Sequence, residues 1–179
     1  EAFEAAVDGM IYGKEMARTR ADDRICKVPY VRSAPVDTFW DLGLSKASGT
    51  TAIWCHQHIA LQHRFLKGYE SHGQSLDHYV KWLLDTGYAF GTHYLPHDAG
   101  ARRMGKTTTK PWIEMLRELM PGHKFELVPV IDDVAKGIEQ TKLKFDECVF
   151  DEVGCDDGIK ALENYQNEFD AAAGTFRNY

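Results

Sequence analysis

The sequence predicts an α/β domain with one mixed sheet, in which three antiparallel strands are followed by parallel strands and helices cover both faces. Three strand-like segments follow one another between Thr38 and Glu70 with short turns between them. Helical and strand-like segments then alternate, as they do in α/β proteins. A length of 179 residues and a hydrophobic fraction of 44% fit one domain, residues 1–179, with its own core.

The three leading strands are predicted at residues 38–42, 51–58 and 59–70, where apolar, β-branched and aromatic residues gather. The turn-rich segment 43–50 separates the first two. A short helix is expected before them, at residues 10–17. Three strands joined this closely predict an antiparallel meander.

The apolar spacing changes to a helical period after Ser75. A helix is predicted over residues 75–85, with Ser75 as its N-cap and Gly87 as its stop signal. The remaining elements are then predicted in chain order: strand 90–95, helix 111–119, strand 125–130, helix 132–145, strand 148–150 and helix 158–170.

The charge and the cysteines limit the function classes. A net charge of −6 is unusual for a protein that binds nucleic acid through a basic face, although a nuclease needs a local acidic cluster to hold cations. The cysteines, Cys26, Cys55, Cys148 and Cys155, lack zinc spacing and are expected to be reduced. No secretory signal or membrane span is visible, so a cytoplasmic protein is expected. Because the chain begins without Met, we expect a fragment of a longer protein.

Two aspartates carry the predicted chemistry. Asp41 lies near the end of the first strand, and Asp98 follows the strand at 90–95. If these strands are parallel neighbours, both carboxylates lie at one edge of the sheet, where sites of open α/β sheets gather. For either aspartate alone, a hydrogen bond that caps a turn explains the residue as well as metal binding does. The two together favour a site for Mg²⁺ or Mn²⁺, which prefer oxygen ligands. Two such ions hydrolyse phosphodiesters without a side-chain nucleophile.

Several segments resemble the nuclease domain of tailed-phage terminase large subunits: residues 40–43 (WDLG), 51–54 (TAIW), 93–99 (HYLPHDA), 106–116 and 150–151 with the helix after them. The likeness runs from about residue 5 to residue 177. It implies an RNase H-like fold and a two-metal endonuclease that cuts concatemeric phage DNA during packaging in the host cytoplasm. It implies Asp41 and Asp98 as catalytic metal ligands, and double-stranded DNA, the portal and the small terminase subunit as partners.

The sequence departs from the family pattern in two places. The loop at residues 45–50 lacks the aspartate that often precedes Thr-Ala in the family. The family's third catalytic aspartate lies in a helix with an Ala-Asp-Ala-like motif, and none of Asp151, Asp156, Asp157 and Asp170 has that context. We therefore expect a chain that lacks the last helix as well as the N-terminal ATPase, and whose cleavage is impaired.

A rival motif occupies residues 100–107 (GARRMGKT), which fit the phosphate-binding loop of NTPases, and residues 148–152 (CVFDE) resemble the Mg²⁺-binding strand of ATPases. Residues 96–98 separate that loop from the strand, and the next helix is predicted only near Pro111, so a nuclease is preferred. In that interpretation Arg102, Arg103 and Lys106 contact the DNA backbone beside Asp98. A non-catalytic docking module of a packaging motor is the remaining alternative.

His56, His58 and His63 and the four tryptophans are interpreted as structural, whereas His93 and His97, which flank the second acid, also allow a role at a metal. His56 and His58 share one face of a strand, but no third zinc ligand accompanies them, and packing explains them better. For His97, beside Asp98, a structural role is also the more common one. The four tryptophans are expected in the core.

Overall fold

The computed structural model describes residues 9–43, 49–101, 110–131 and 133–166, and the backbone of residues 169–170 and 175–176. Its elements, in chain order, are α2 (Gly13–Ala21), β1 (Ile25–Cys26), β2 (Val36–Leu42), β3 (Thr50–Ile59), β4 (Gln62–His72), α3 (Leu76–Asp85), β5 (Phe90–Leu95), the 3₁₀ turn η1 (His97–Gly100), α4 (Trp112–Leu119), β6 (Lys124–Leu127), α5 (Val134–Lys144), the 3₁₀ turn η2 (Phe145–Glu147), β7 (Cys148–Asp151), α6 (Asp156–Glu163), β8 (Phe169–Asp170) and β9 (Thr175–Phe176).

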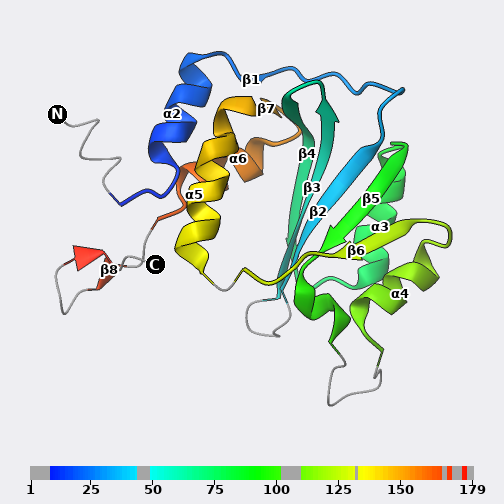
Figure 1. Cartoon of the computed structure of the whole chain (residues 1–179). Helices are drawn as coiled ribbons and strands as arrows, with labels where there is room; N and C mark the ends of the chain where they lie inside the picture. Colours follow the sequence, from blue (N-terminus) through cyan, green and yellow to red (C-terminus); the bar gives the residue numbers. More distant parts are fainter. Residues whose placement is uncertain are drawn as a thin grey trace.

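A seven-stranded sheet, in the order β1-β7-β4-β3-β2-β5-β6, forms the centre of the fold (Figure 1). Strands β2, β3 and β4 form an antiparallel meander, as predicted. The later strands add in parallel at the two sides: β5 beside β2, β6 beside β5, and β7 beside β4. The predicted mixed sheet is therefore confirmed.

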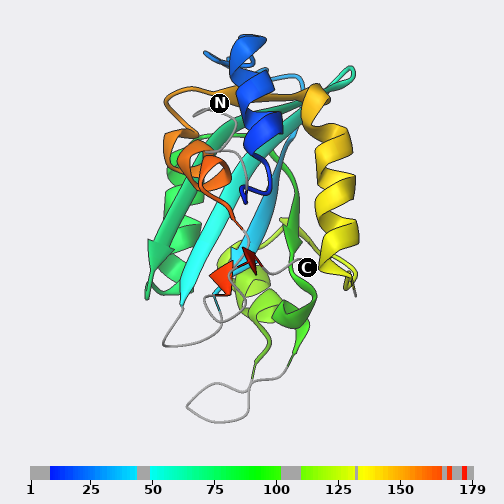
Figure 2. The same ribbon diagram turned by 90° about the vertical axis from the view of Figure 1, so that its left-hand side faces the viewer.

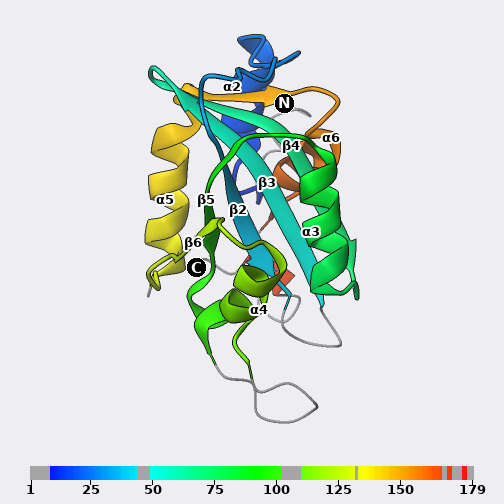
Figure 3. The ribbon, with the colours of Figure 1, turned by 90° about the vertical axis from the view of Figure 1, so that its right-hand side faces the viewer.

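Helices cover both faces of the sheet, also as predicted. Figure 2 shows α2, α5 and α6 on one face, and Figure 3 shows α3 and α4 on the other. Strand β2 explains the division, because its alternate residues Val36, Thr38, Trp40 and Leu42 are buried toward α3 and α4. The intervening residues of β2 therefore face the layer that contains α5 and α6.

The face toward α3 and α4 holds the larger core. Helix α3 buries Leu76, Tyr79, Val80 and Leu83 against the sheet. The left-handed backbone of Gly87 (φ 68°) follows this helix, in agreement with the predicted stop. Ser75 occupies the predicted N-cap position, but its side chain makes no capping hydrogen bond.

Three predictions of elements need correction. The first helix begins at Gly13 instead of residue 10. The last helix ends at Glu163, and the backbone of residues 169–170 belongs to β8, which pairs with β9. Strand β1 was not predicted; it pairs in parallel with β7, Ile25 opposite Phe150.

The four cysteines are free thiols, as expected. In the part of the chain that the structure describes, no helix has the length and apolar composition that a membrane span requires.

Candidate metal centre

Asp41 is the penultimate residue of β2 and is exposed on the sheet face that carries α5 and α6. Its neighbours Trp40 and Leu42 are buried on the opposite face, so the strand period fixes the direction of the carboxylate. A Cβ at Gly43 would collide with the backbone of Thr50, so only glycine lets β3 begin this close to the end of β2. The local sequence therefore presents Asp41 at the rim of the sheet.

Asp98 lies in η1, directly after β5. The turn is closed by hydrogen bonds from the amide of Ala99 to the carbonyl of Pro96 and from the amide of Ala101 to the carbonyl of Asp98, both 3.0 Å. Ala99 is fully buried and anchors the turn in the core. The Oδ1 atom of Asp98 is buried without a hydrogen-bond partner among the described residues. A buried carboxylate oxygen without a partner is costly, and a cation would remove that cost.

The two aspartates lie at the same edge of the sheet. Strands β2 and β5 are adjacent and parallel, with Phe39 opposite Tyr94, and both acids come at or just after the carboxyl ends of these strands. The arrangement that the sequence prediction required, parallel neighbours with both acids at one edge, is therefore met. Within the described ranges, no three His, Cys, Asp or Glu side chains are grouped closely enough to hold a metal ion by themselves.

The predicted DNA-binding residues Arg102, Arg103 and Lys106 lie outside the described residues. Lys110, at the end of that segment, pairs with Glu118 at 2.5 Å, and this hydrogen bond raises the pKa of the lysine. Helix α4 begins at Trp112, six residues after Lys106. A phosphate-binding loop would run straight into its helix, so this distance does not favour the NTPase interpretation.

Asp151, which belongs to the second segment of the rival NTPase motif, is held by hydrogen bonds within the fold. Its Oδ2 accepts a hydrogen bond from the amide of Val28 at 2.8 Å, and its Oδ1 accepts from the amides of Val153 and Gly154 at 3.2 and 2.7 Å. The carboxylate therefore holds the turn after β7 and the segment after β1. These three hydrogen bonds account for the presence of an aspartate at position 151 without a bound Mg²⁺.

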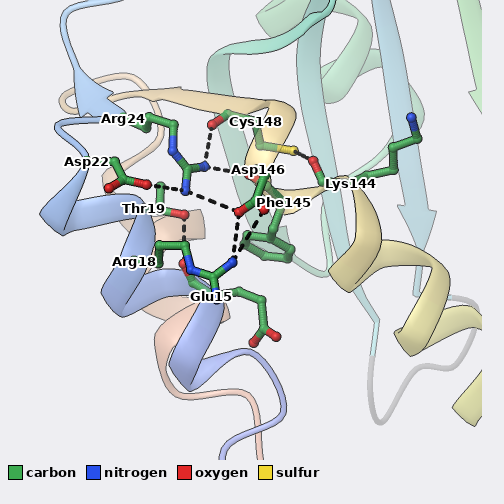
Figure 4. A network of polar contacts seen from close by, with 9 residues as sticks. All are labelled: Glu15, Arg18, Thr19, Asp22, Arg24, Lys144, Phe145, Asp146 and Cys148. Atoms are coloured by element: carbon green, nitrogen blue, oxygen red, sulfur yellow. Dashed lines mark hydrogen bonds and ion pairs between the residues drawn. The ribbon is translucent and has the colours of Figure 1, made fainter.

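The basic residues near the start of the chain are also engaged within the fold, as Figure 4 shows. Arg24 donates from Nη1 to the carbonyl oxygens of Phe145 and Cys148, at 2.5 and 3.1 Å. Arg18 pairs with Asp146 at 3.1 Å, although both side chains are largely exposed. This cluster links α2 to η2 and β7, and its guanidinium groups are directed to protein acceptors.

Two buried histidines, His93 and His56, lie on opposite faces of the sheet, and each is close to a partly exposed histidine. His93 is 0% exposed and lies between Thr38 Oγ1, 2.7 Å from its Nδ1, and His123 Nδ1, 3.1 Å from its Nε2. Burial, with a smaller effect of His123, lowers the pKa of His93 to about 4. His56 Nε2 lies 3.0 Å from His63 Nδ1, and burial lowers its pKa to about 4 as well. Both buried imidazoles are therefore neutral at pH 7, which for His56 agrees with the predicted packing role.

An apolar groove of about 690 Å³ separates α5 from the sheet. Its floor is aromatic and includes Phe39, which is 39% exposed and stacks on Tyr94 with ring centroids 5.3 Å apart. Gln140 and Lys144 of α5 form the opposite wall. Sequence reasoning did not anticipate this groove, because it predicted α5 without predicting how loosely the helix covers the sheet.

No model of a protein family and no curated protein matches the chain. Solved structures do. The large terminase of a thermophilic bacteriophage superposes with a TM-score of 0.65 at 18% identity, over 94% of this chain and 40% of that one. The chain has the fold of a large-terminase nuclease domain. The large terminase nuclease of thermophilic phage G20c, with bound magnesium, matches with a TM-score of 0.57 at 14% identity, over 96% of this chain and 88% of that one.

A third match to this nuclease fold is the g2p (large terminase) nuclease domain of bacteriophage SPP1 with bound Mn, with a TM-score of 0.54 at 14% identity, over 80% of this chain and 75% of that one. The resemblance seen in the sequence is thus confirmed as a likeness of fold. The chain spans about two fifths of the first of these large terminases and most of the length of the separate nuclease domains.

Proposed function

We propose that this chain is a metal-dependent DNA endonuclease that cuts concatemeric phage DNA during genome packaging. One observation carries the proposal: Asp41 and Asp98 lie at the carboxyl ends of adjacent parallel strands, and one oxygen of Asp98 is buried without a partner among the described residues. Solved terminase nucleases of the same fold contain bound Mn or magnesium. The cofactors proposed here are accordingly two Mg²⁺ or Mn²⁺ ions.

Asp41 and Asp98 are the residues that would hold the ions. A bound divalent ion supplies an activated water and neutralises charge on the phosphate and the leaving oxygen. The rigid sheet fixes the Asp41 carboxylate, because its neighbours along β2 are buried on the other face. The closed turn η1 fixes Asp98 at the same edge. The two carboxylates would thus hold the ions at the rim, where the phosphate of a large polymer can reach them.

The substrate and partners of the proposal follow from the nuclease fold. Double-stranded DNA would lie across the rim with its backbone held by Arg102, Arg103 and Lys106. The portal and the small terminase subunit are the proposed protein partners, and the host cytoplasm is the proposed location. Replacing Arg102 and Arg103 by Glu is expected to weaken DNA binding at low salt; unchanged binding would remove these residues from the interface.

A plasmid-cleavage assay tests the enzyme. The chain is incubated with supercoiled DNA and Mg²⁺ or Mn²⁺, and nicked and linear products are quantified. Asp41→Asn and Asp98→Asn are each expected to lower the rate by about 100-fold or more, because a lost metal ligand costs several kcal/mol in the transition state. Asp77→Asn, which neutralises an exposed aspartate in the first turn of α3, is the matched control and should cleave normally.

The second candidate function is a docking module of a packaging motor without catalysis. The apolar groove with the exposed Phe39 side chain favours it, since exposed aromatic surface is typical of protein interfaces. Metal-dependent cleavage that disappears in the two aspartate variants would exclude this candidate. Absence of cleavage with every divalent metal, both by this chain and by one with a C-terminal extension, would favour it over the enzyme.

A further inference from the structure

Three histidines lie on one face of the β3–β4 hairpin, close to its turn. His58 is paired directly with His63 across the antiparallel ladder, and His56 lies two residues before His58 on β3. Residues paired directly across a ladder, and residues two apart on one strand, project from the same face. The rings are accordingly close: the centroids of His58 and His63 are 4.7 Å apart, and those of His56 and His63 are 5.2 Å apart.

A carboxylate from a distant part of the chain lies against this group. Glu147 belongs to η2, and its Oε2 atom is 3.6 Å from Nε2 of His63. This separation is longer than a normal N–H···O hydrogen bond. It is close to the distance of about 3.3–3.5 Å between a nitrogen and an oxygen that bind one tetrahedral zinc ion. The fold therefore supplies the further ligand that the sequence around the histidines lacks.

The imidazoles are in the protonation state that binds metals. Burial, followed by the neighbouring His58, lowers the pKa of His63, and burial lowers the pKa of His56 to about 4. Both rings are therefore neutral at pH 7, and each has one nitrogen with a free lone pair. Nδ1 of His63 lies 3.0 Å from Nε2 of His56. With a metal ion on its Nε2, His63 would donate its Nδ1 proton to His56, the outer hydrogen bond that metal-bound histidines usually make.

Two exposed side chains must move for the ligands to close around an ion. In the part of the chain that the structure describes, no three such side chains converge in their present positions. His58 is exposed, and a change of its rotamer would add the second imidazole. Lys144 donates to both oxygens of Glu147, at 2.9 and 3.0 Å. Because exposed ion pairs of this kind contribute little free energy, a divalent ion can displace the ammonium group.

We propose that His58, His63 and Glu147 form a site for a transition-metal ion such as Zn²⁺, which prefers imidazole ligands more than Mg²⁺ does. The inference does not depend on the proposed function. Ala52, which is paired with Asp41, lies six residues before His58, or about 20 Å along β3. Because η2 leads directly into β7, a bound ion would fasten the β3–β4 hairpin to the segment that pairs with β4.

Calorimetric titration with Zn²⁺ in excess Mg²⁺ tests the site, since Mg²⁺ occupies oxygen-ligand sites without competing for imidazoles. His58→Gln and His63→Gln are each expected to weaken Zn²⁺ binding by about 100-fold, at least the upper end of the cost of losing an outer hydrogen-bond partner. Lys144→Met should strengthen binding, because it frees Glu147 and removes a positive charge near the ion. His72→Gln, an exposed histidine at the other end of β4, is the matched control and should bind like the wild-type chain.

Cu²⁺ electron paramagnetic resonance identifies the ligands, because imidazole nitrogens split the signal. The wild-type chain should show two such nitrogens and His58→Gln only one. A wild-type chain that binds no Zn²⁺, or equal affinity in His58→Gln and His63→Gln, would overturn the site. Loss of Zn²⁺ binding in Asp41→Asn would also overturn it, by assigning the ion to the nuclease edge. Equal binding by Lys144→Met and the wild-type chain would overturn the role of the carboxylate. Unfolding temperatures without metal identify any variant that has lost its fold.

Discussion

Lowering the pH from 7 to 5 is expected to destabilise the fold through the buried imidazole of His93. This side chain is 0% exposed, and it lies between the hydroxyl of Thr38 and the ring of His123. Burial, followed by the neighbouring His123, lowers its pKa from 6.5 to about 4. The unfolded chain therefore takes up a proton on His93 at a pH where the folded chain does not.

The magnitude follows from proton linkage. Because the unfolded chain binds the proton below about pH 6.5 and the folded chain only below about pH 4, stability falls as the pH drops through this interval. Each pH unit inside the interval costs about 1.4 kcal/mol for one proton, so His93 accounts for about 2 kcal/mol between pH 7 and pH 5. His56, whose pKa burial also lowers to about 4, adds a loss of similar size.

Urea denaturation followed by tryptophan fluorescence at pH 7, 6 and 5 measures this dependence. His93→Asn, which keeps a polar group near Thr38 but does not titrate, should be less stable at pH 7 and lose about 2 kcal/mol less on acidification. His72→Asn changes an exposed histidine and should keep the wild-type slope. Equal slopes for the wild-type chain and His93→Asn would refute the reasoning.

Three further predictions concern stability, each read from the urea midpoint. Arg24→Ala should cost about 2–3 kcal/mol, because it removes charged hydrogen bonds to two carbonyl oxygens; a cost below about 0.5 kcal/mol would contradict the packing in Figure 4. Asp151→Ala should cost about 3 kcal/mol through three orphaned amides, with no change in metal binding; weaker metal binding would restore the NTPase interpretation. Gly158→Ala should destabilise by about 1–3 kcal/mol because a Cβ there overlaps the Trp54 ring, whereas Gly137→Ala, with room at 3.5 Å, should stabilise by up to about 1 kcal/mol; equal effects would refute the steric argument.

Local patterns in the sequence were sufficient to predict the central strands and the position of Asp41 and Asp98 at one edge of the sheet. The alternation of β2 is visible because Trp40 and Leu42 are apolar while Asp41 between them is not. The strand that precedes Asp98 is equally clear, and together they predicted the common edge. Both signals extend over only a few neighbouring residues, which is what sequence periodicity can report.

Features that depend on distant partners were not visible. Strand β1 has two residues, Ile25 and Cys26, and exists only because β7 pairs with it. The alignment of His58 with His63 depends on the register of β3 and β4, which contains an irregularity between Cys55 and His56. The last helix was extended too far because acidic and amide residues after Glu163 continue its composition without continuing its packing.

The contacts of Arg24 with residues near β7 can form only late in synthesis, after β7 has been made. Arg24 and Cys148 are 124 residues apart, and β1 and β7 meet only through pairs of similar separation. A ribosome that has released the meander and α3 still leaves one side of β4 unpaired, because β7 is made much later. Contacts this distant in sequence slow folding, so we expect the nascent chain to expose the free edge of β4, and to be prone to association, until β7 is made. Expression at low temperature or with chaperones should therefore raise the yield of the native domain.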